Sequence, residues 1–182
     1  MSLGQLVHMA GFAVLALACA GALYGVGAIF ALWRFLARPA PALADAPAVT
    51  VLKPMHGPEP ELYENLKSLA AQDYPGPVQI IMGARDADDP ALAVASRLKA
   101  DRPNLDITLV ADATQHGTNR KLSNLLNMWP TARGEIVVIS DSDVRLPSDG
   151  LRQIVATLQQ PGVGLIHCLY RGRPAAGARR CR

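Results

Sequence analysis

Short apolar runs alternate with amphipathic stretches along residues 49–168. The runs are rich in β-branched residues and end at Pro, Gly or Asp, which is typical of strands. Between them, apolar residues recur at every third or fourth position, which predicts helices. We expect strands at 49–53, 78–82, 106–110, 136–139 and 163–168. This repeated alternation predicts an α/β fold with a parallel sheet and right-handed connections.

The same pattern predicts which side chains are buried. The strand at 136–139 has no polar break, so we expect it to be buried on both faces of the sheet. Helices are expected with Pro60 in a first turn, from Pro90 after the cap Asp89, over 119–128, and from Pro147. In the helix at 119–128 we expect Lys121 and Asn124 to lie on a different face from the buried side chains, which are Leu122, Leu125, Leu126 and Trp129.

The N-terminal part of the chain has a different pattern. No charged residue occurs from Met9 to Trp33, which is long enough for a membrane-spanning helix of roughly 20 residues. A signal peptide would carry positive charge before the apolar run, whereas here Arg34 and Arg38 follow it. We therefore expect a single transmembrane helix at 1–36, a Pro/Ala linker at 37–48, an α/β domain at 49–172 and an arginine-rich tail at 173–182.

Composition and charge exclude some classes of function. Five arginines lie in the last twelve residues, so the net charge is +3 for the whole chain and −2 without them. The basic character therefore belongs to the tail, and we expect no nucleic-acid partner. The three cysteines, Cys19, Cys168 and Cys181, suggest neither a disulfide framework nor a zinc site.

The strongest candidate chemistry follows the strand at 136–139. Asp141 and Asp143 are two residues apart, so in an extended chain their carboxylates point the same way. Their mutual repulsion is relieved by a cation, and hard oxygen ligands suit Mg²⁺ or Mn²⁺ together with substrate phosphates. The alternative is a pair of acidic residues in a surface turn, although the apolar strand before them favours a metal–diphosphate site.

Two other strand ends carry polar groups: the loop from Pro54 to Glu59, and Asp86. Carboxyl ends of parallel strands define one crevice, so we expect these groups to lie together. Asp86 could accept from a uracil imide or a ribose hydroxyl, or belong to an acidic turn. Lys121 could neutralise a diphosphate or be a solvated helix lysine, and His56 could bond substrate or only fill its loop. No G-x-G-x-x-G or Walker A motif occurs.

Six motifs in order give the sequence a family resemblance. The chain resembles the ceramide glucosyltransferase-type glycosyltransferases, and within them the bacterial hopanoid-biosynthesis members. The motifs are Leu-Lys-Pro-Met-His-Gly-Pro-Glu (52–59), Gln-Asp-Tyr-Pro (72–75), Arg-Asp-Ala-Asp-Asp-Pro-Ala (85–91), Asn-Arg-Lys-Leu-Ser-Asn-Leu-Leu-Asn-Met (119–128), Asp-Ser-Asp-Val-Arg (141–145) and Gly-Val-Gly-Leu-Ile-His-Cys-Leu-Tyr-Arg-Gly (162–172).

The resemblance implies a GT-A fold at the cytoplasmic face of the inner membrane. It implies inverting, Mg²⁺- or Mn²⁺-assisted transfer of GlcNAc or glucose from a UDP-sugar to the hydroxyl of a hopanoid or ceramide-like lipid. The implied metal ligands are Asp141 and Asp143, and the implied nucleotide-sugar residues are Pro54, His56, Glu59, Asp86, Lys121, Asn124 and Asp141.

The resemblance ends at Gly172. The family continues with a third signature Asp, the general base, and an R-W motif, whereas residues 173–182 resemble out-of-frame translation or a disordered tail. We therefore expect an incomplete domain with an unidentified catalytic base and little or no activity. Two alternatives are a pseudoenzyme that binds a UDP-sugar and, with less support, a Mg²⁺-dependent phosphoacceptor domain.

The positions of Arg34 and Arg38 predict the topology of the chain. Because positive charge stays in the cytoplasm, a periplasm-active reporter fused after Ala48 should remain silent in cells. Strong reporter activity would place the domain outside, where it would have no access to cytoplasmic UDP-sugars.

Overall fold

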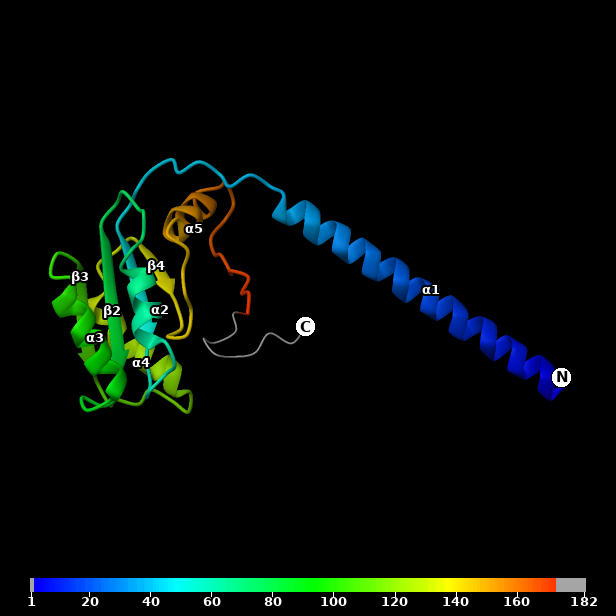
Figure 1. Ribbon diagram of the computed structural model, residues 1–182, viewed down its shortest axis with the longest axis horizontal. Helices are drawn as coiled ribbons and strands as arrows, with labels where there is room; N and C mark the ends of the chain where they lie inside the picture. Colours follow the sequence, from blue (N-terminus) through cyan, green and yellow to red (C-terminus); the bar gives the residue numbers. More distant parts are fainter. Residues whose placement is uncertain (1, 173–182) are drawn as a thin grey trace. The chain divides into compact units, whose positions relative to one another are not determined.

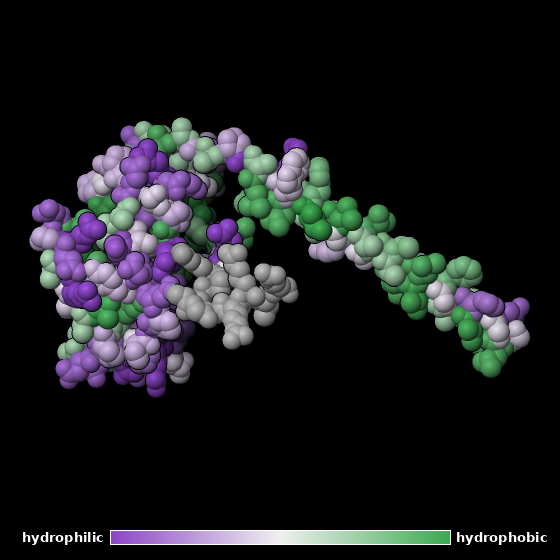
Figure 2. Space-filling view, viewed as in Figure 1, coloured by the Kyte–Doolittle hydropathy of each residue, from purple (hydrophilic) through white to green (hydrophobic). Residues whose placement is uncertain are grey.

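The computed structural model describes residues 2–172 and divides the chain near Ala40 into two compact units. The expected tail at 173–182 lies outside the described residues. The first unit is helix α1 (Leu3–Leu36), which is apolar along its surface (Figure 2) and buries none of its residues. Its most apolar 18-residue window has a mean hydropathy of 2.1. By length and composition α1 could cross a membrane, and a signal sequence would pass the same test.

The second unit is built on a four-stranded parallel sheet of β1 (Val49–Pro54), β2 (Val78–Ala84), β3 (Asp106–Ala111) and β4 (Ile136–Ile139), in the order β3-β2-β1-β4. Figure 1 labels β2, β3 and β4 of this sheet. Val51 of β1 lies opposite Ile80 of β2 and Val138 of β4. The predicted parallel α/β fold is confirmed. The elements are β1 (Val49–Pro54), α2 (Leu62–Leu69), β2 (Val78–Ala84), α3 (Pro90–Asp101), β3 (Asp106–Ala111), α4 (Arg120–Met128), the 3₁₀ turn η1 (Trp129–Thr131), β4 (Ile136–Ile139) and α5 (Gly150–Leu158).

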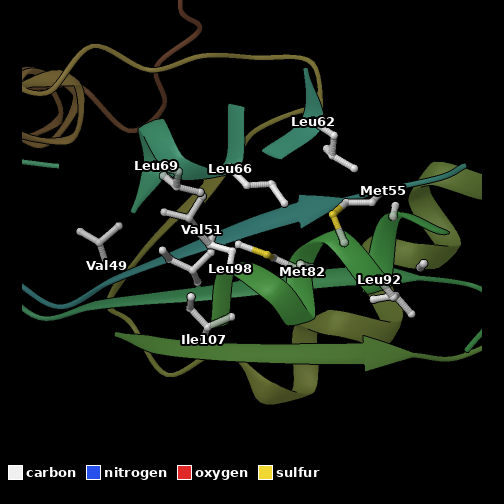
Figure 3. Close-up of a cluster of buried hydrophobic side chains, with 14 of the residues drawn as sticks. Val49, Val51, Met55, Leu62, Leu66, Leu69, Met82, Leu92, Leu98 and Ile107 are labelled. Atoms are coloured by element: carbon white, nitrogen blue, oxygen red, sulfur yellow. The ribbon is translucent and has the colours of Figure 1, made fainter. Parts of the chain in front are cut away.

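The main hydrophobic core lies between one face of the sheet and helices α2, α3 and α5. Alternate strand residues point to this face, including Val51 of β1 and Met82 of β2 (Figure 3). They pack against apolar side chains of the helices: Leu62, Leu66 and Leu69 of α2, Ala91, Leu92, Ala95 and Leu98 of α3, and Leu151 and Val155 of α5. The apolar periodicity therefore predicted this face of the domain correctly.

The opposite face has a much smaller core that is covered by α4. Among residues 2–172, the fully buried apolar side chains of this core are Leu52, Ile81 and Met128. Our prediction for α4 was wrong, because its buried residues are Ser123, Asn124 and Met128, while Leu122, Leu126 and Trp129 are about half exposed. The side-chain amide of Asn124 donates to the carbonyl of Gly83, at 2.8 Å, so a polar contact orients this helix.

Two predictions about strands were also wrong. Residues 163–168 form no strand, and Leu165 is 84% exposed. Strand β4 is partly exposed instead of buried on both faces, because it pairs with β1 alone among the described residues. Gly162, with φ +80°, lies in a turn where the amide of Val163 donates to Gln160, so the chain bends before 163–168.

Two helix starts differ from the sequence prediction. Pro60 lies outside α2, because Glu61 has φ +58° in the left-handed region and the helix begins at Leu62. Helix α5 begins at Gly150 instead of Pro147.

A buried polar pair positions the chain that enters β4. The hydroxyl of Thr50 donates to the side-chain oxygen of Gln79, at 2.8 Å, and accepts from the amide of Gly134, at 2.8 Å. The Gln79 amide nitrogen donates to the carbonyl of Thr131, at 2.9 Å. Residues 131–134 are thus bonded to β1 and β2, which fixes where β4 begins.

Gly134 is expected to tolerate no side chain. A Cβ there would lie 2.4 Å from the backbone nitrogen of Thr50, so Gly134→Ala should lower the free energy of unfolding by about 1–3 kcal/mol. Urea unfolding of the detergent-solubilised chain measures this. The control is Gly117→Ala, where a Cβ has no neighbour within 4 Å. Equal stabilities of the two variants would contradict the close approach.

Candidate functional site

The eight residues predicted from the sequence line one cleft of about 1250 Å³. The cleft lies where the carboxyl ends of β1 and β4 meet. The chain runs outward from β1 to β2 and β3, then returns to place β4 on the other side of β1, so this is the switch point where open α/β sheets bind ligands. The eight residues are Pro54, His56, Glu59, Asp86, Lys121, Asn124, Asp141 and Asp143.

The loop after β4 presents the two candidate metal ligands. The amide of Ser140 extends the ladder to the carbonyl of Leu52, and the amide of Val144 closes a turn on the carbonyl of Asp141, at 3.1 Å. Asp141 Oδ1 lies 2.5 Å from Lys121 Nζ, and both side chains are about half exposed. The carboxylate of Asp143 has no hydrogen bond or ion pair among residues 2–172.

Lys53 is the residue that sequence reasoning missed. It is only 1% exposed at the end of β1, and its ammonium donates to Ser140 Oγ (3.3 Å) and to the carbonyls of Asp141 (2.6 Å) and Val144 (3.1 Å). Burial lowers the pKa of Lys53 to about 8, while the nearby carboxylates of Asp143, Asp141 and Glu59 act in the opposite direction. The only signal in the sequence was a lysine inside a strand with no other charged residue, which is unusual for a buried position.

Glu59 holds the same loop from the opposite side of the cleft. Its Oε1 accepts from the hydroxyl of Ser142, at 2.6 Å, while its Oε2 is buried with no hydrogen-bond partner in the described part of the chain. The side-chain amide of Asn65 donates to the Ser142 carbonyl, at 3.3 Å. Ser142, the residue between the two aspartates, therefore anchors the loop through its hydroxyl and its carbonyl.

A buried carboxylate anchors the loop after β1. Asp89, the predicted cap of α3, accepts from the amide of Ala91 and from the amide of Gly57, each at 2.9 Å. Gly57 has φ +69°, a conformation that favours glycine. His56 Nδ1 lies 3.3 Å from Asp89 Oδ2, and the His56 side chain is 88% exposed. His56 thus lies on the rim of the cleft, held by the helix cap.

Asp86 and Asn124 lie near the end of β2. Asp86 is exposed, and its Oδ1 accepts from the amide of Asp88, at 3.0 Å, as in an Asx turn. Asn124 uses its amide nitrogen to bond Gly83, and its Oδ1 is buried without a partner in the described residues. Both alternatives weighed for Asp86 remain compatible with this geometry, since an Asx turn leaves its second oxygen available.

The aspartate pair fits a hard divalent cation that the protein ligates incompletely. Asp141 and Asp143 supply carboxylate oxygens, the ligands preferred by Mg²⁺ and Mn²⁺. No group of three or more His, Cys, Asp or Glu side chains suitable for a metal occurs in the described residues. A cation held here would need further oxygens from water or a diphosphate. In this structure the ammonium of Lys121 forms an ion pair with the carboxylate of Asp141.

Comparisons with known proteins identify relatives of this chain. The sequence profile of glycosyl transferase family 21 matches residues 13–181. A ceramide glucosyltransferase from Gibberella zeae is 31% identical over 80% of this chain and 32% of its own length. Ceramide glucosyltransferase 1 from Caenorhabditis elegans is 30% identical over 83% of this chain and 33% of its own length. The chain thus spans about one third of the length of these relatives.

A solved structure supports the fold. The mannosyltransferase PcManGT from Pyrobaculum calidifontis, in complex with GDP-Man and Mn²⁺, matches with a TM-score of 0.63 and 30% identity. The match covers 86% of this chain and 46% of the mannosyltransferase. This confirms the predicted GT-A fold over the part that is covered. With a family match over nearly its whole length, the chain belongs to glycosyl transferase family 21.

Proposed function

We propose that this chain forms the donor-binding part of a membrane-anchored glycosyltransferase that moves a hexose from a UDP-sugar to a lipid hydroxyl. The observation that carries the proposal is the position of Asp141 and Asp143 at the switch point of the sheet, facing the β1 loop across one cleft. Two comparisons support the proposal. The solved structure of PcManGT is a complex with GDP-Man and Mn²⁺, and the curated relatives are named ceramide glucosyltransferases.

The proposed roles divide the cleft between nucleotide and diphosphate. Asp86 binds uridine, and the loop from Pro54 to Glu59, with His56, lies along the nucleotide. Asp141 and Asp143 hold Mg²⁺ or Mn²⁺, and Asn124, in the nucleotide-side helix α4, lines the same cleft. Lys121 would exchange its contact with Asp141 for the diphosphate once a metal neutralises that carboxylate. The metal, when bound, stabilises the negative charge of the leaving UDP.

The acceptor and the compartment are further parts of the proposal. We favour a hopanoid or ceramide-like lipid as acceptor and GlcNAc or glucose as the sugar, with inversion at the anomeric carbon. A lipid acceptor agrees with an apolar N-terminal helix and with the names of the relatives. The proposed location is the inner membrane, with α1 as the span and the α/β domain in the cytoplasm, where UDP-sugars are made.

A donor-binding role without turnover is the second candidate. Inverting transfer needs a base within hydrogen-bond reach of the acceptor hydroxyl. We assign no such base among residues 2–172. Of the cleft carboxylates, Glu59 and Asp89 bond the loops, Asp86, Asp141 and Asp143 have donor-side roles, and Asp88 lies beside Asp86 on the uridine side. We therefore propose that the 182-residue chain binds donor and transfers little or no sugar by itself. Membership in a glycosyltransferase family argues against the phosphoacceptor alternative.

Asp143→Asn should weaken metal-dependent binding of UDP. The carboxylate is proposed to be a direct metal ligand, so the expected loss is about 1–3 kcal/mol, or roughly 5–150-fold in Kd. Calorimetry with UDP, with and without Mn²⁺, measures this on the solubilised chain. Asp45→Asn, the same chemical change at an exposed position outside the cleft, should leave the Kd unchanged. Equal affinity of the wild type with and without Mn²⁺ would refute the metal assignment.

Asp86→Ala tests the uridine role separately. Because Asp86 is proposed to contact the nucleoside, its loss should weaken binding of uridine alone, in the absence of metal, by about 1–3 kcal/mol. Asp143→Asn should leave metal-free uridine binding unaffected. If both variants reduced the two affinities in parallel, the proposed division of the cleft would be wrong.

A further inference from the structure

The ammonium of Lys53 has no free donor. It carries three N–H groups, and it has three acceptors: Ser140 Oγ, the Asp141 carbonyl and the Val144 carbonyl. At 1% exposure the side chain is closed off from solvent and from the cleft. Lys53 is also absent from the residues that line the cleft. A direct contact between this ammonium and a phosphate is therefore excluded by its existing bonds.

Two of the three acceptors of Lys53, the carbonyls of Asp141 and Val144, belong to one short turn, and the third, Ser140 Oγ, directly precedes it. The Asp141 carbonyl accepts both from Lys53 and from the amide of Val144, so the turn at 141–144 is closed by its own hydrogen bond and by the shared ammonium. Asn65 bonds the carbonyl of Ser142 in the same turn. With these carbonyls bonded inside the protein, the carboxylates of Asp141 and Asp143 remain on the cleft side.

A buried charge of this kind has an electrostatic effect beyond its hydrogen bonds. Lys53 is close enough to Asp143, Asp141 and Glu59 for each carboxylate to act on its pKa. By the same interaction, a positive charge that is held in place by three hydrogen bonds lies near the carboxylates of Asp141 and Asp143. Lys121 supplies a second positive charge, but it is half exposed and bonded to Asp141 alone in the described residues. Of these two ammonium groups, Lys53 is the one that is buried and held by three hydrogen bonds.

We propose that Lys53 is the positioning residue of the aspartate pair: its buried ammonium shapes the turn at 141–144 so that the two carboxylates can bind metal and diphosphate together. This inference rests on the proposed function for the identity of the ligand. It differs from a general structural role, because the effect is confined to the metal side of the cleft and does not reach the uridine side at Asp86.

The decisive variants are Lys53→Met, which removes the charge and all three donors, and Lys53→Arg, which keeps both charge and donors. Groups that orient metal ligands typically change metal affinity about 10–100-fold. We expect Lys53→Met to raise the Kd for UDP in the presence of Mn²⁺ by that factor and to leave metal-free uridine binding within about twofold. Lys53→Arg should recover part of the loss. Lys99→Met, at an exposed position on α3, is the matched control and should behave as wild type.

Three results with these variants would overturn the proposal. One is a Lys53→Met chain that binds UDP with Mn²⁺ as tightly as wild type. The second is an equal loss of uridine and Mn²⁺–UDP affinity in a folded Lys53→Met chain, since that pattern indicates a general loss of structure. Failure of Lys53→Arg to recover any affinity would also contradict the role of the ammonium.

Hydrogen exchange of the wild-type chain tests the loop without any ligand or variant. The amide of Val144 should exchange slowly, because its bond to Asp141 is held by Lys53. The amide of Gly117, which is exposed and donates no hydrogen bond within the described part of the chain, should exchange fast. Equal rates would overturn the proposal even if Lys53→Met fails to fold. If UDP binding proves independent of Mn²⁺ but Val144 is protected, the proposed function fails and the positioning of the loop by Lys53 stands.

Discussion

Lys53 lies at the end of the central strand β1, where its ammonium is removed from water and has to be bonded within the protein. An unpaired ammonium at this depth would be strongly destabilising, so the strand, its neighbour β4 and the following turn have to come together in one arrangement. Its three bonds connect the end of β1 to Ser140, Asp141 and Val144. The geometry of the turn at 141–144, which presents the two aspartates to the cleft, depends on this charge.

The two faces of the sheet have different roles around this centre. The face covered by α2, α3 and α5 holds most of the apolar core. The face covered by α4 has three fully buried apolar residues and depends on polar bonds, such as that from Asn124 to Gly83. An element held by few apolar contacts opens more easily than the core, and functional segments are commonly drawn from such regions. This agrees with the placement of Lys121 and Asn124, two candidate ligand residues, on α4.

Both loops of the cleft are fixed by polar bonds in addition to the apolar contacts of Met55 and Leu146. Asp89 bonds the loop after β1 while it caps α3, and Glu59 and Asn65 bond the turn after β4. Such groups stabilise one arrangement because any other would leave them unpaired. The exposed carboxylate of Asp143 is therefore presented by an anchored turn. A site arranged in this way needs little reorganisation when a cation and a diphosphate bind.

The sequence by itself determined the α/β class, the first four strands, the apolar stripes of α2 and α3, and the residues that share the cleft. These follow from local periodicity and from the rule that carboxyl ends of parallel strands meet at one edge. Only the tertiary structure decided the burial of Lys53, the polar buried face of α4 and the absence of a strand at 163–168. Each depends on partners distant along the chain. A lysine is buried where another segment supplies three acceptors. A segment with residues typical of strands forms a strand only beside a sheet edge that pairs with it. Periodicity contains no information about those partners.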